Sequence, residues 1–480
     1  MTTNQALTQN NSAELRQALR GALSAQSLIE AADALVPYQT DMLRNKQASP
    51  LLVLAPESTE ELATAMRICA AHRAVVVPFG GNSGFCGGSM TDDSASQIAV
   101  SLHRLNQVLD IDLLNNTMTV QAGCILASIQ TIANDNDRSF PLSHGGEGSA
   151  HIGGCLSTNA GGNAVLRFGM ARDLVLGLEV VLPDGRVLSA LRGLRKDNAG
   201  YDLKQLFLGT EGTLGIITAA VIKLFPMPRH RETAMVAVTS PEAGAQLLAS
   251  LRTELGDVIT ACEMLPRLGI DLAMTVLPSP QEPFESPHPW QVLIEAETNS
   301  AHFALRDALQ EALAHAIEQG IALDALLATS DRQRQALWKL REGIALAAIS
   351  DPSSLKNDQS VPCSKIQSFI DQGSAAVQKL VPGARAVPFG HIGDGNIHFN
   401  VWRPVEMAPE AFIEHWPALV TALEDTATAL GGSIAAEHGI GQSKRDALAR
   451  VKDPVAIDLM RAVKHAIDPE NRLNPGKVVP

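Results

Sequence analysis

Glycine is concentrated in two stretches of this 480-residue chain, with five glycines between residues 80 and 88 and nine between 145 and 177. Glycine adopts positive φ readily and lets backbone N–H groups approach a phosphate closely. One such stretch is as typical of a tight structural turn as of a ligand site. Two of them, with a third glycine-rich run at residues 209–215, favour loops wrapped around a large ligand. Residues 80–89 fit a pyrophosphate.

The class of ligand follows from two motifs that the loops lack. No G-x-G-x-x-G lies between an expected strand and helix, and no G-x-x-x-x-G-K-[ST] occurs anywhere. These are the signatures of Rossmann dinucleotide sites and of P-loops, so NAD and ATP have little support. A dinucleotide held by loops between strands indicates FAD instead.

Chain length indicates the number of domains, and net charge excludes some classes of partner. A chain of 480 residues exceeds what one core usually supports, so we expect two or three domains. The formal net charge of -13 argues against a nucleic-acid partner and against an anionic membrane surface.

Cysteines and hydropathy indicate a cytoplasmic chain with free thiols. The six cysteines form no C-x-x-C pair, which excludes zinc ribbons and iron–sulfur clusters. Residues 1–13 are polar and lack the apolar core of a signal peptide. No run approaches the roughly 18 apolar residues of a transmembrane helix.

The order of expected elements indicates an α+β fold. Residues 12–34 have helical spacing, residues 50–56 form a short apolar strand, and Ser58 caps a helix that runs to about residue 72. Further strands are expected at 74–77, 97–102 and 117–122, and a strand pair is joined by residues 183–185. Beyond a boundary at 226–228, strands at 233–238, 258–264 and 290–297 alternate with helices. That order predicts an antiparallel sheet with helices on one face.

Two histidines flank a Gly-Asp-Gly turn, and a carboxylate with an adjacent histidine follows later in the chain. His391 and His398 with Glu437 offer the imidazole and carboxylate ligands of a catalytic divalent metal, and His438 is then a base beside it. If residues 387–401 are extended around the turn, His398 and Asn400 share one face while Phe399 and Val401 share the other. A lone histidine more often hydrogen-bonds within a core. This cluster with its glycines favours the metal.

These features belong to a set of motifs that covers nearly the whole chain after about residue 45. The motifs lie at residues 78–84, 151–154, 157–162, 167–169, 194–204, 209–217, 391–400, 437–439 and 474–477. Together they resemble the FAD-dependent D-2-hydroxyacid dehydrogenases of the vanillyl-alcohol oxidase / p-cresol methylhydroxylase flavoprotein superfamily. The hydroxyglutarate-oxidising members are the most similar.

The resemblance implies four regions. Residues 1–45 form an N-terminal helical segment, and residues 46–227 form a two-subdomain FAD-binding domain of the p-cresol methylhydroxylase type. Residues 228–430 form an α+β substrate-binding cap, and residues 431–480 form a C-terminal segment that packs back on the flavin domain.

The resemblance also implies a set of FAD contacts in the glycine-rich loops. They are Pro78, Gly80, Gly81, Asn82, Ser83, Gly84, Gly88, Ser89, Pro141, Gly145, Gly148, Ile152, Gly153, Ser157, Asn159, Gly161, Glu211, Gly212, Gly215, Ile216 and Asn474. Some members of the superfamily attach FAD covalently through His or Cys. The 78–89 loop contains no His, and Cys155 and His144 are the alternative attachment points. We expect noncovalent FAD.

Residue by residue, the resemblance makes His391, His398 and Glu437 metal ligands, with zinc expected and manganese or iron as alternatives. His438 resembles the catalytic base and also contacts substrate. Arg341 and Lys356 resemble contacts to the substrate carboxylates, and Asn400 resembles a polar contact of hydroxyglutarate-type members. One position departs from the pattern: Ala345 stands where those members often have Thr, which leaves the identity of the diacid open.

Oxidation of a 2-hydroxy acid has three requirements that these residues meet. Arg341 and Lys356 can hold the carboxylate, the metal can stabilise the alkoxide, and His438 can accept the proton. The hydride passes to the flavin. We expect oxidation of D-2-hydroxyglutarate, or of a near diacid such as D-malate, to the 2-oxo acid.

Two alternative functions remain open, and the resemblance also bears on the electron acceptor. D-lactate or glycolate is the alternative substrate that Ala345 favours. A flavin-binding electron-transfer subunit without a substrate site is the alternative from another class, and the intact His/Glu set weighs against it. The resemblance implies an electron-transfer flavoprotein or a quinone as electron acceptor, and we expect a homodimer.

Overall fold

The computed structural model describes residues 9–42 and 47–480. Most of the polar stretch predicted at residues 1–13, and position 46, where the FAD-binding domain was predicted to begin, lie outside the described residues. The chain forms two compact units. Unit 1 comprises Met1–Gly161, Met170–Pro226 and Glu437–Pro480, and unit 2 comprises Gly162–Gly169 and Met227–Ala436. Among the described residues, no helix combines the length and the apolar character needed to cross a membrane.

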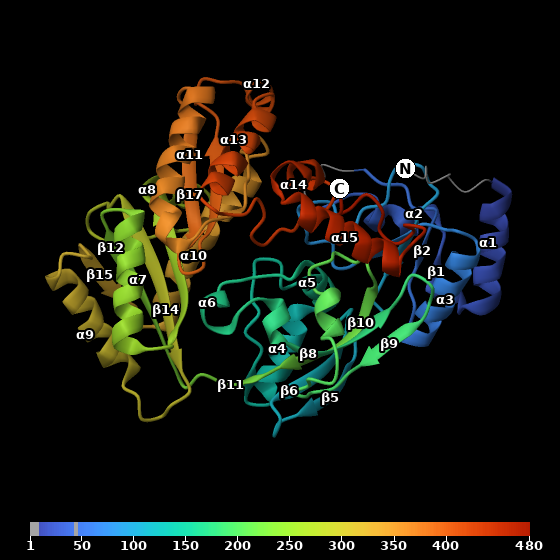
Figure 1. Cartoon of the computed structure of the whole chain (residues 1–480). Helices are drawn as coiled ribbons and strands as arrows, with labels where there is room; N and C mark the ends of the chain where they lie inside the picture. Colours follow the sequence, from blue (N-terminus) through green and yellow to red (C-terminus); the bar gives the residue numbers. More distant parts are fainter. Residues whose placement is uncertain (1–8, 43–46) are drawn as a thin grey trace. The chain divides into compact units, whose positions relative to one another are not determined.

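Unit 1 contains two main sheets (Figure 1). The first has the order β1-β2-β4-β3, with β4 parallel to both β2 and β3. The second is antiparallel, with the order β5-β6-β10-β8-β9. The strands of unit 1 are β1 (Leu28–Ile29), β2 (Leu52–Leu54), β3 (Val76–Phe79), β4 (Ile98–Ser101), β5 (Val108–Asp112), β6 (Thr117–Gln121), β8 (Val175–Val181), β9 (Val187–Ala190) and β10 (Ile216–Lys223). A further pair consists of β7 (Arg138–Ser139) and β11 (Phe225–Pro226).

The helices of unit 1 connect and cover these strands. They are α1 (Gln9–Ala22), α2 (Ala32–Leu35), α3 (Thr59–Ala71), α4 (Leu126–Asp135), α5 (Ile152–Thr158), α14 (Arg445–Val451) and α15 (Pro454–Ile467). The predicted cap of α3 is confirmed, because the Ser58 hydroxyl accepts a hydrogen bond from Glu61 N at 3.1 Å. The prediction of one or two helices over residues 12–34 is confirmed for α1 and α2 but was wrong between them, because Ile29 lies in β1 and pairs with Val53. Strand pairing overrides the helical spacing there.

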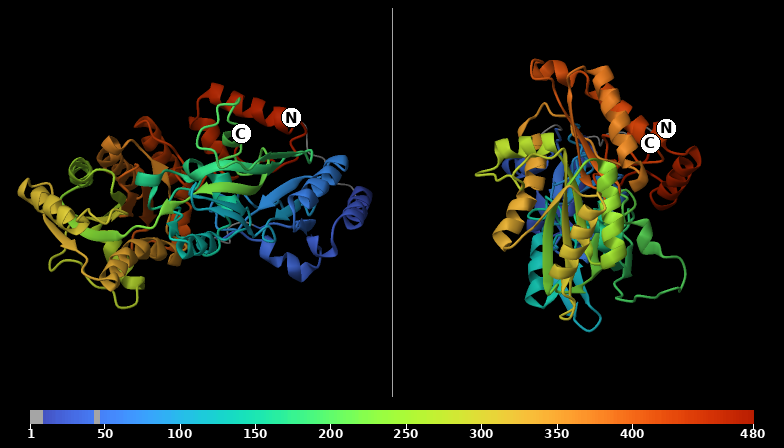
Figure 2. Two further views of the ribbon diagram at one scale, coloured as in Figure 1. Left: turned by 90° about the horizontal axis from the view of Figure 1, so that it is seen from below. Right: turned by 90° about the vertical axis from the view of Figure 1, so that its left-hand side faces the viewer.

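The C-terminal segment, whose helices are red in Figure 2, pairs with an early strand of unit 1. Leu473 forms a parallel bridge with Val76. The buried Lys464 ammonium donates to Asp468 Oδ2, Thr213 O and Leu473 O at 2.6–2.8 Å. This buried ion pair with two carbonyl contacts ties α15 to the 209–215 loop. A glycine-rich loop is therefore supported by residues that follow it by more than two hundred positions.

Unit 2 is built on one antiparallel sheet with the order β15-β12-β14-β13-β17-β18-β16. Its strands are β12 (His230–Val238), β13 (Ile259–Pro266), β14 (Trp290–Thr298), β15 (Asp324–Leu327), β16 (Gln359–Ser360), β17 (Arg385–His391) and β18 (Asn396–Trp402). Its helices are α6 (Val165–Phe168), α7 (Pro241–Leu255), α8 (Arg267–Val276), α9 (Leu305–Glu318), α10 (Asp331–Ser350), α11 (Ile366–Leu380), α12 (Pro409–Ile413) and α13 (Trp416–Ala429).

Helices cover both faces of this sheet, so the prediction of helices on one face was wrong. One core joins the sheet to α7, α9, α11 and α13, with Leu247, Leu309 and Phe369 at its centre. The other joins the opposite face to α8 and α10 through Ile270 and Ile344. The physical reason lies in β13, whose eight positions are all buried, as in a sheet packed on both sides. The prediction of a mixed helix-and-sheet fold is confirmed.

Candidate active site

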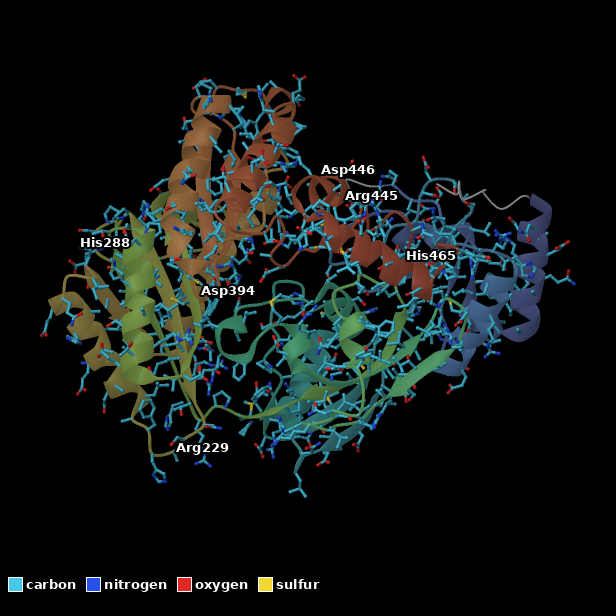
Figure 3. The ribbon with its side chains drawn as sticks, in the orientation of Figure 1. Arg229, His288, Asp394, Arg445, Asp446 and His465 are labelled. Carbon is cyan, nitrogen blue, oxygen red and sulfur yellow. The ribbon has the colours of Figure 1, made fainter. Side chains whose placement is uncertain are left out.

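The hairpin of β17 and β18 positions the predicted histidine pair. His391 is the last residue of β17, and the turn that follows contains Asp394 (Figure 3). The Asp394 carboxylate accepts a hydrogen bond from Asn396 N at 3.0 Å, which closes the turn. Gly395 has φ +83°, and a Cβ there would lie 1.9 Å from Val361 O, so the turn requires glycine.

Strand alternation sorts the side chains of β18 as predicted. Phe399 and Val401 are buried in the core with α11 and α13. His398 lies on the opposite face, where its ring is 5.1 Å from that of Phe389, a residue of the α8/α10 core. Asn400 follows His398 by two positions and shares its face. The predicted division of these four residues between the two faces is confirmed.

His391 and His398 lie close enough to bind one ion. Their ring centroids are 5.6 Å apart, and a nitrogen of each ring lies within 4.8 Å of the other. A third donor of unit 2, Asp358, was not predicted. Its carboxylate is fully buried, lies 3.9 Å from His398 Nδ1, and accepts a hydrogen bond from Asn396 Nδ2 at 2.8 Å. Two imidazoles with a nearby carboxylate are a donor set that suits zinc, manganese or iron.

Glu263, a fully buried carboxylate of β13, was not predicted as a site residue. Glu263 Oε1 lies 2.6 Å from His391 Nδ1, and Glu263 Oε2 accepts a hydrogen bond from Arg341 Nε at 2.6 Å. Burial alone would raise the pKa of Glu263, but the charges and hydrogen bonds of His391 and Arg341 hold it well below its ordinary value. The available signal was a single acidic residue inside an apolar strand.

Arg341 comes from α10, a helix that begins at the Ser330 cap and packs on the α8/α10 face. Its guanidinium carbon lies 4.9 Å from the centroid of the Phe389 ring, which is a cation–π distance. The structure therefore brings Arg341 onto the same sheet face as the histidine pair. Ala345, one turn further along α10, packs against the apolar core of that face.

Lys356 and Asn400 are held in the same region by the 351–357 loop. The Lys356 ammonium donates to Ser354 O at 3.0 Å and to the Ser354 hydroxyl at 3.1 Å. Burial lowers the pKa of Lys356, with Asp351 acting in the opposite direction. Asn400 Oδ1 accepts a hydrogen bond from Asn357 N at 3.2 Å. Both residues thus have contacts within unit 2 that orient them.

The glycine-rich loops predicted to hold FAD lie together in unit 1. A Cβ on Gly81 would lie 2.0 Å from Ser149 O, and a Cβ on Gly212 would lie 2.9 Å from Pro78. Other positions in the predicted set border open space. No protein atom lies within 4 Å of a Cβ placed on Gly84, Gly145 or Gly148. Loops that pack on one another while leaving room at these glycines fit a bound dinucleotide.

Several predicted FAD contacts hold the loops in place. Asn474 Nδ2 donates to Gly88 O and Glu211 O at 3.0 and 2.7 Å, so it joins two of the loops. Glu211 N donates to Ser157 O at 2.7 Å. Asn159 Oδ1 accepts a hydrogen bond from Arg172 N at 2.9 Å. The side chains of Asn474 and Asn159 are thus engaged with the protein itself.

Glu437 and His438 begin the last segment of unit 1. A Cβ on Gly161 would lie 2.9 Å from Glu437 Oε1, so Glu437 borders a predicted FAD loop. The His438 ring lies edge-on to Phe85 of the 78–89 loop, with centroids 4.7 Å apart. The Cys86 thiol donates to Gly439 O at 3.4 Å. Phe85 was not among the predicted site residues.

Glu211 holds the backbone that follows His438. Its carboxylate accepts hydrogen bonds from Ile440 N at 2.7 Å and from Gly441 N at 2.9 Å. Gly439 has φ +75°, and a Cβ there would lie 2.6 Å from Glu211 Oε1. Burial raises the pKa of Glu211, with the two amide donors acting in the opposite direction. The carboxylate of this predicted FAD residue is thus bonded to the loop after His438.

The two residues named as alternative covalent attachment points contact each other. Cys155 Sγ lies 3.5 Å from His144 Nε2. Burial raises the pKa of the Cys155 thiol to about 12. Nucleophilic attachment requires the thiolate, which this environment disfavours.

Both parts of the chain match described families. Residues 50–190 match the "FAD binding domain" family, and residues 227–478 match "FAD linked oxidases, C-terminal domain". The chain belongs to the FAD-linked oxidase family. The family resemblance and the FAD cofactor predicted from the sequence are confirmed.

Relatives of similar length support this membership. The mitochondrial D-2-hydroxyglutarate dehydrogenase of Bos taurus is 38% identical over 461 residues, covering 93% of this chain and 80% of the relative. The D-2-hydroxyglutarate dehydrogenase of Xanthomonas citri pv. viticola is 35% identical over 446 residues, covering 92% of each chain. The one of Stutzerimonas stutzeri is 34% identical over 452 residues, covering 93% and 95%.

Solved structures show the same fold at low sequence identity. p-Cresol methylhydroxylase with substrate bound superposes with a TM-score of 0.77 at 17% identity, covering 98% of this chain and 97% of that one. Alkyldihydroxyacetonephosphate synthase superposes with a TM-score of 0.73 at 18% identity, covering 96% and 84%.

Proposed function

We propose that this chain is an FAD- and divalent-metal-dependent dehydrogenase that oxidises D-2-hydroxyglutarate, or a near diacid such as D-malate, to the 2-oxo acid. Homologues named D-2-hydroxyglutarate dehydrogenase support FAD-dependent oxidation of a D-2-hydroxy acid. The observation that carries the proposal is the placement of Arg341, His391 and His398 on one sheet face, with Arg341 and His391 bound to the same carboxylate. An anion contact and a metal-ligand pair side by side suit a hydroxy acid.

The chain's own residues have separable roles in this reaction. Arg341 binds a substrate carboxylate through its planar fork of N–H donors, and Lys356 acts on a carboxylate as a point charge. Asn400 adds a polar contact for a second carboxylate. His438 takes the proton of the substrate hydroxyl on a ring nitrogen.

The metal ligands are His391, His398 and Glu437, with zinc expected and manganese or iron as alternatives. A divalent metal at these residues supplies Lewis-acid chemistry that lowers the pKa of the substrate hydroxyl. Asp358 supports the set, since it lies beside His398 and accepts a hydrogen bond from Ala436 N at 3.2 Å, the residue before Glu437.

FAD supplies the hydride-accepting chemistry when it is bound to the loops of unit 1. We infer that it is bound noncovalently, because the thiol of Cys155 is buried and its pKa is raised. The electron acceptor that we propose, on the family resemblance, is an electron-transfer flavoprotein or a quinone.

A second candidate substrate is D-lactate or glycolate. Ala345 favours the monoacid, because alanine has no hydroxyl to offer a second carboxylate and packs against the apolar core of the α8/α10 face. The Lys356 and Asn400 contacts favour the diacid.

Anaerobic flavin reduction tests the proposal directly. The absorbance of the oxidised flavin is followed after addition of D-2-hydroxyglutarate, D-malate, D-lactate or glycolate. Fast bleaching by the diacids alone supports the proposal. Bleaching by D-lactate or glycolate alone assigns the monoacid, and no bleaching by any hydroxy acid favours an electron-transfer subunit.

The variant H438A tests the base. It should retain FAD and lose about 10²–10⁴-fold in the rate of flavin reduction, which is the usual contribution of a general base. The matched control is H465A, because His465 is an exposed histidine of α15 in the same unit (Figure 3). H465A should reduce at the wild-type rate, and full activity of H438A would remove His438 from the mechanism.

A further inference from the structure

A buried carboxylate links the anion-binding residue to the metal-ligand pair in unit 2. Glu263 lies directly opposite His391 in the pairing of β13 with β17. One of its oxygens is 2.6 Å from His391 Nδ1, and the other is 2.6 Å from Arg341 Nε. The carboxylate is fully buried, so both partners are held without competition from water.

The 2.6 Å approach of Glu263 Oε1 to Nδ1 favours the tautomer of His391 that carries its proton on Nδ1. An imidazole whose Nδ1–H donates to a carboxylate carries its ring lone pair on Nε2, and the contact makes that nitrogen a stronger ligand. It also fixes the ring orientation. His391 therefore presents a defined nitrogen on the face that it shares with His398.

The same carboxylate sets the orientation of Arg341. Because Nε donates to Glu263, the guanidinium plane is fixed, and the edge formed by Nη1 and Nη2 is left for a carboxylate of the substrate. Phe389 supports this placement, since its ring lies 4.9 Å from the guanidinium carbon and 5.1 Å from the His398 ring. The Phe389 ring thus lies between Arg341 and His398 on one face of the sheet.

Burial of an ionised carboxylate in a sheet is costly, and apolar residues in place of both Glu263 and Arg341 would stabilise the fold at least as well as the ion pair. A role in stability alone therefore accounts poorly for Glu263. We propose that Glu263 is a positioning residue that sets His391 for metal binding and Arg341 for substrate binding at once. This inference rests on the proposed function and adds to it a residue that touches neither substrate nor flavin.

The test uses the FAD-containing full chain, stripped of metal with a chelator and titrated with Zn²⁺ in a calorimeter. E263Q should weaken Zn²⁺ binding about 10–100-fold, as loss of an outer partner of a ligating histidine usually does. It should also raise KM for the hydroxy acid, because Arg341 loses its orienting partner. Flavin content, read from the absorbance, should stay unchanged.

The matched control is E295Q. Glu295 is a largely buried carboxylate of the neighbouring strand β14, and it accepts a hydrogen bond from Trp338 Nε1 of α10 at 2.8 Å. It thus joins the sheet to the same helix through different partners. E295Q should retain the wild-type Zn²⁺ affinity and KM. Equal losses in E263Q and E295Q would overturn the inference.

E263D provides a rescue, because it keeps the charge on a shorter side chain, and its Zn²⁺ affinity should fall between wild type and E263Q. If E263Q fails to fold because the Arg341 cation is left buried and unpaired, the double variant E263Q/R341M removes that charge. The double variant should fold and show the weakened Zn²⁺ binding.

The outcomes separate the inference from the proposed function. Wild-type protein that binds Zn²⁺ while E263Q binds it equally well overturns the positioning role and leaves the metal centre intact. Wild-type protein that binds no divalent metal overturns both.

Discussion

One carboxylate in each unit organises predicted site residues of that unit or the backbone beside them. Glu263 holds His391 and Arg341 in unit 2, whereas Glu211 holds Ile440 N and Gly441 N in unit 1. Glu263 orients groups from two other elements, β17 and α10, whereas Glu211 orients two consecutive amides of one loop. Single substitutions at these positions should therefore act beyond the contact that they remove.

The raised pKa of Glu211 predicts a pH-dependent effect of E211Q on stability. A folded-state pKa above the ordinary 4.5 means that the folded state binds the proton more tightly than the unfolded state. That stabilisation is full below about pH 4.5 and is lost as the pH rises through the folded-state pKa. The neutral Gln loses nothing over this range.

Urea unfolding at a series of pH values from acid to neutral measures this effect. The free energy of unfolding of E211Q relative to wild type should rise with pH. A difference that stays constant over the series would mean that the Glu211 carboxylate titrates alike in both states.

Part of the residue-level site could be predicted from local patterns. The face shared by His398 and Asn400 follows from the period-two alternation of a strand, which needs no tertiary information. Glu263 and Asp358 could not be assigned, because their importance comes from partners on other strands and helices. A single glutamate in the run 259–266 is the one local sign of a buried charge.

At the level of elements, the packing of the 78–89 loop on the 145–151 loop predicts different losses for two glycine substitutions: stability for one and FAD affinity for the other. In G81A the new Cβ would lie 2.0 Å from Ser149 O, a backbone atom that cannot move cheaply. The flavin-free protein should lose about 1–3 kcal/mol of stability, or more. In G84A no protein atom lies within 4 Å of the new Cβ, so stability should hold while FAD affinity falls.

Urea unfolding of the flavin-free variants and titration with FAD, followed by flavin fluorescence, distinguish the two effects. If G84A binds FAD as tightly as wild type, the open space at Gly84 is not part of the FAD site. If G81A is as stable as wild type, the two loops are less closely packed than the structure shows.

The elements also show what tertiary packing adds to sequence patterns. The cap of α3 and the strand pair β8–β9 were predicted, because capping and turn residues act locally. The second helical layer of unit 2 was missed, although the near-continuous apolar run of β13 is the usual sign of burial on both faces. The short strand β1 was missed because its two residues are paired by a distant segment.

For the whole molecule, the environment of Cys155 predicts that FAD is released on denaturation. The thiol is buried beside His144 and its pKa is raised to about 12, so the thiolate needed for attachment is scarce. Acid precipitation should therefore leave all the flavin in the supernatant. C155S should behave in the same way and keep its flavin content in the native state.

Flavin that remains in the pellet of wild type and not of C155S would establish covalent attachment at Cys155. Flavin that remains in both would point to another residue, with His144 the first to test.

Sequence patterns predict only part of the division of the chain into two units. Proline-rich residues 226–228 mark one point where the chain leaves unit 1, and a local break of this kind is readable. The assignment of residues 162–169 to unit 2 could not be read in this way, because the motif at 167–169 lies within them and the resemblance places it in the flavin-binding domain. Their place depends on contacts such as that of Arg167 Nη1 with Glu297 O at 2.9 Å.

The bridge between Val76 and Leu473 has a consequence for synthesis on the ribosome. Unit 2 is almost contiguous in sequence, so it can fold while the chain is still growing. Unit 1 needs its last segment, residues 437–480, before β3 gains its bridge to Leu473 and the 209–215 loop gains Lys464. The flavin site is therefore completed only after residues 437–480 have been synthesised, long after the glycine-rich loops that they support.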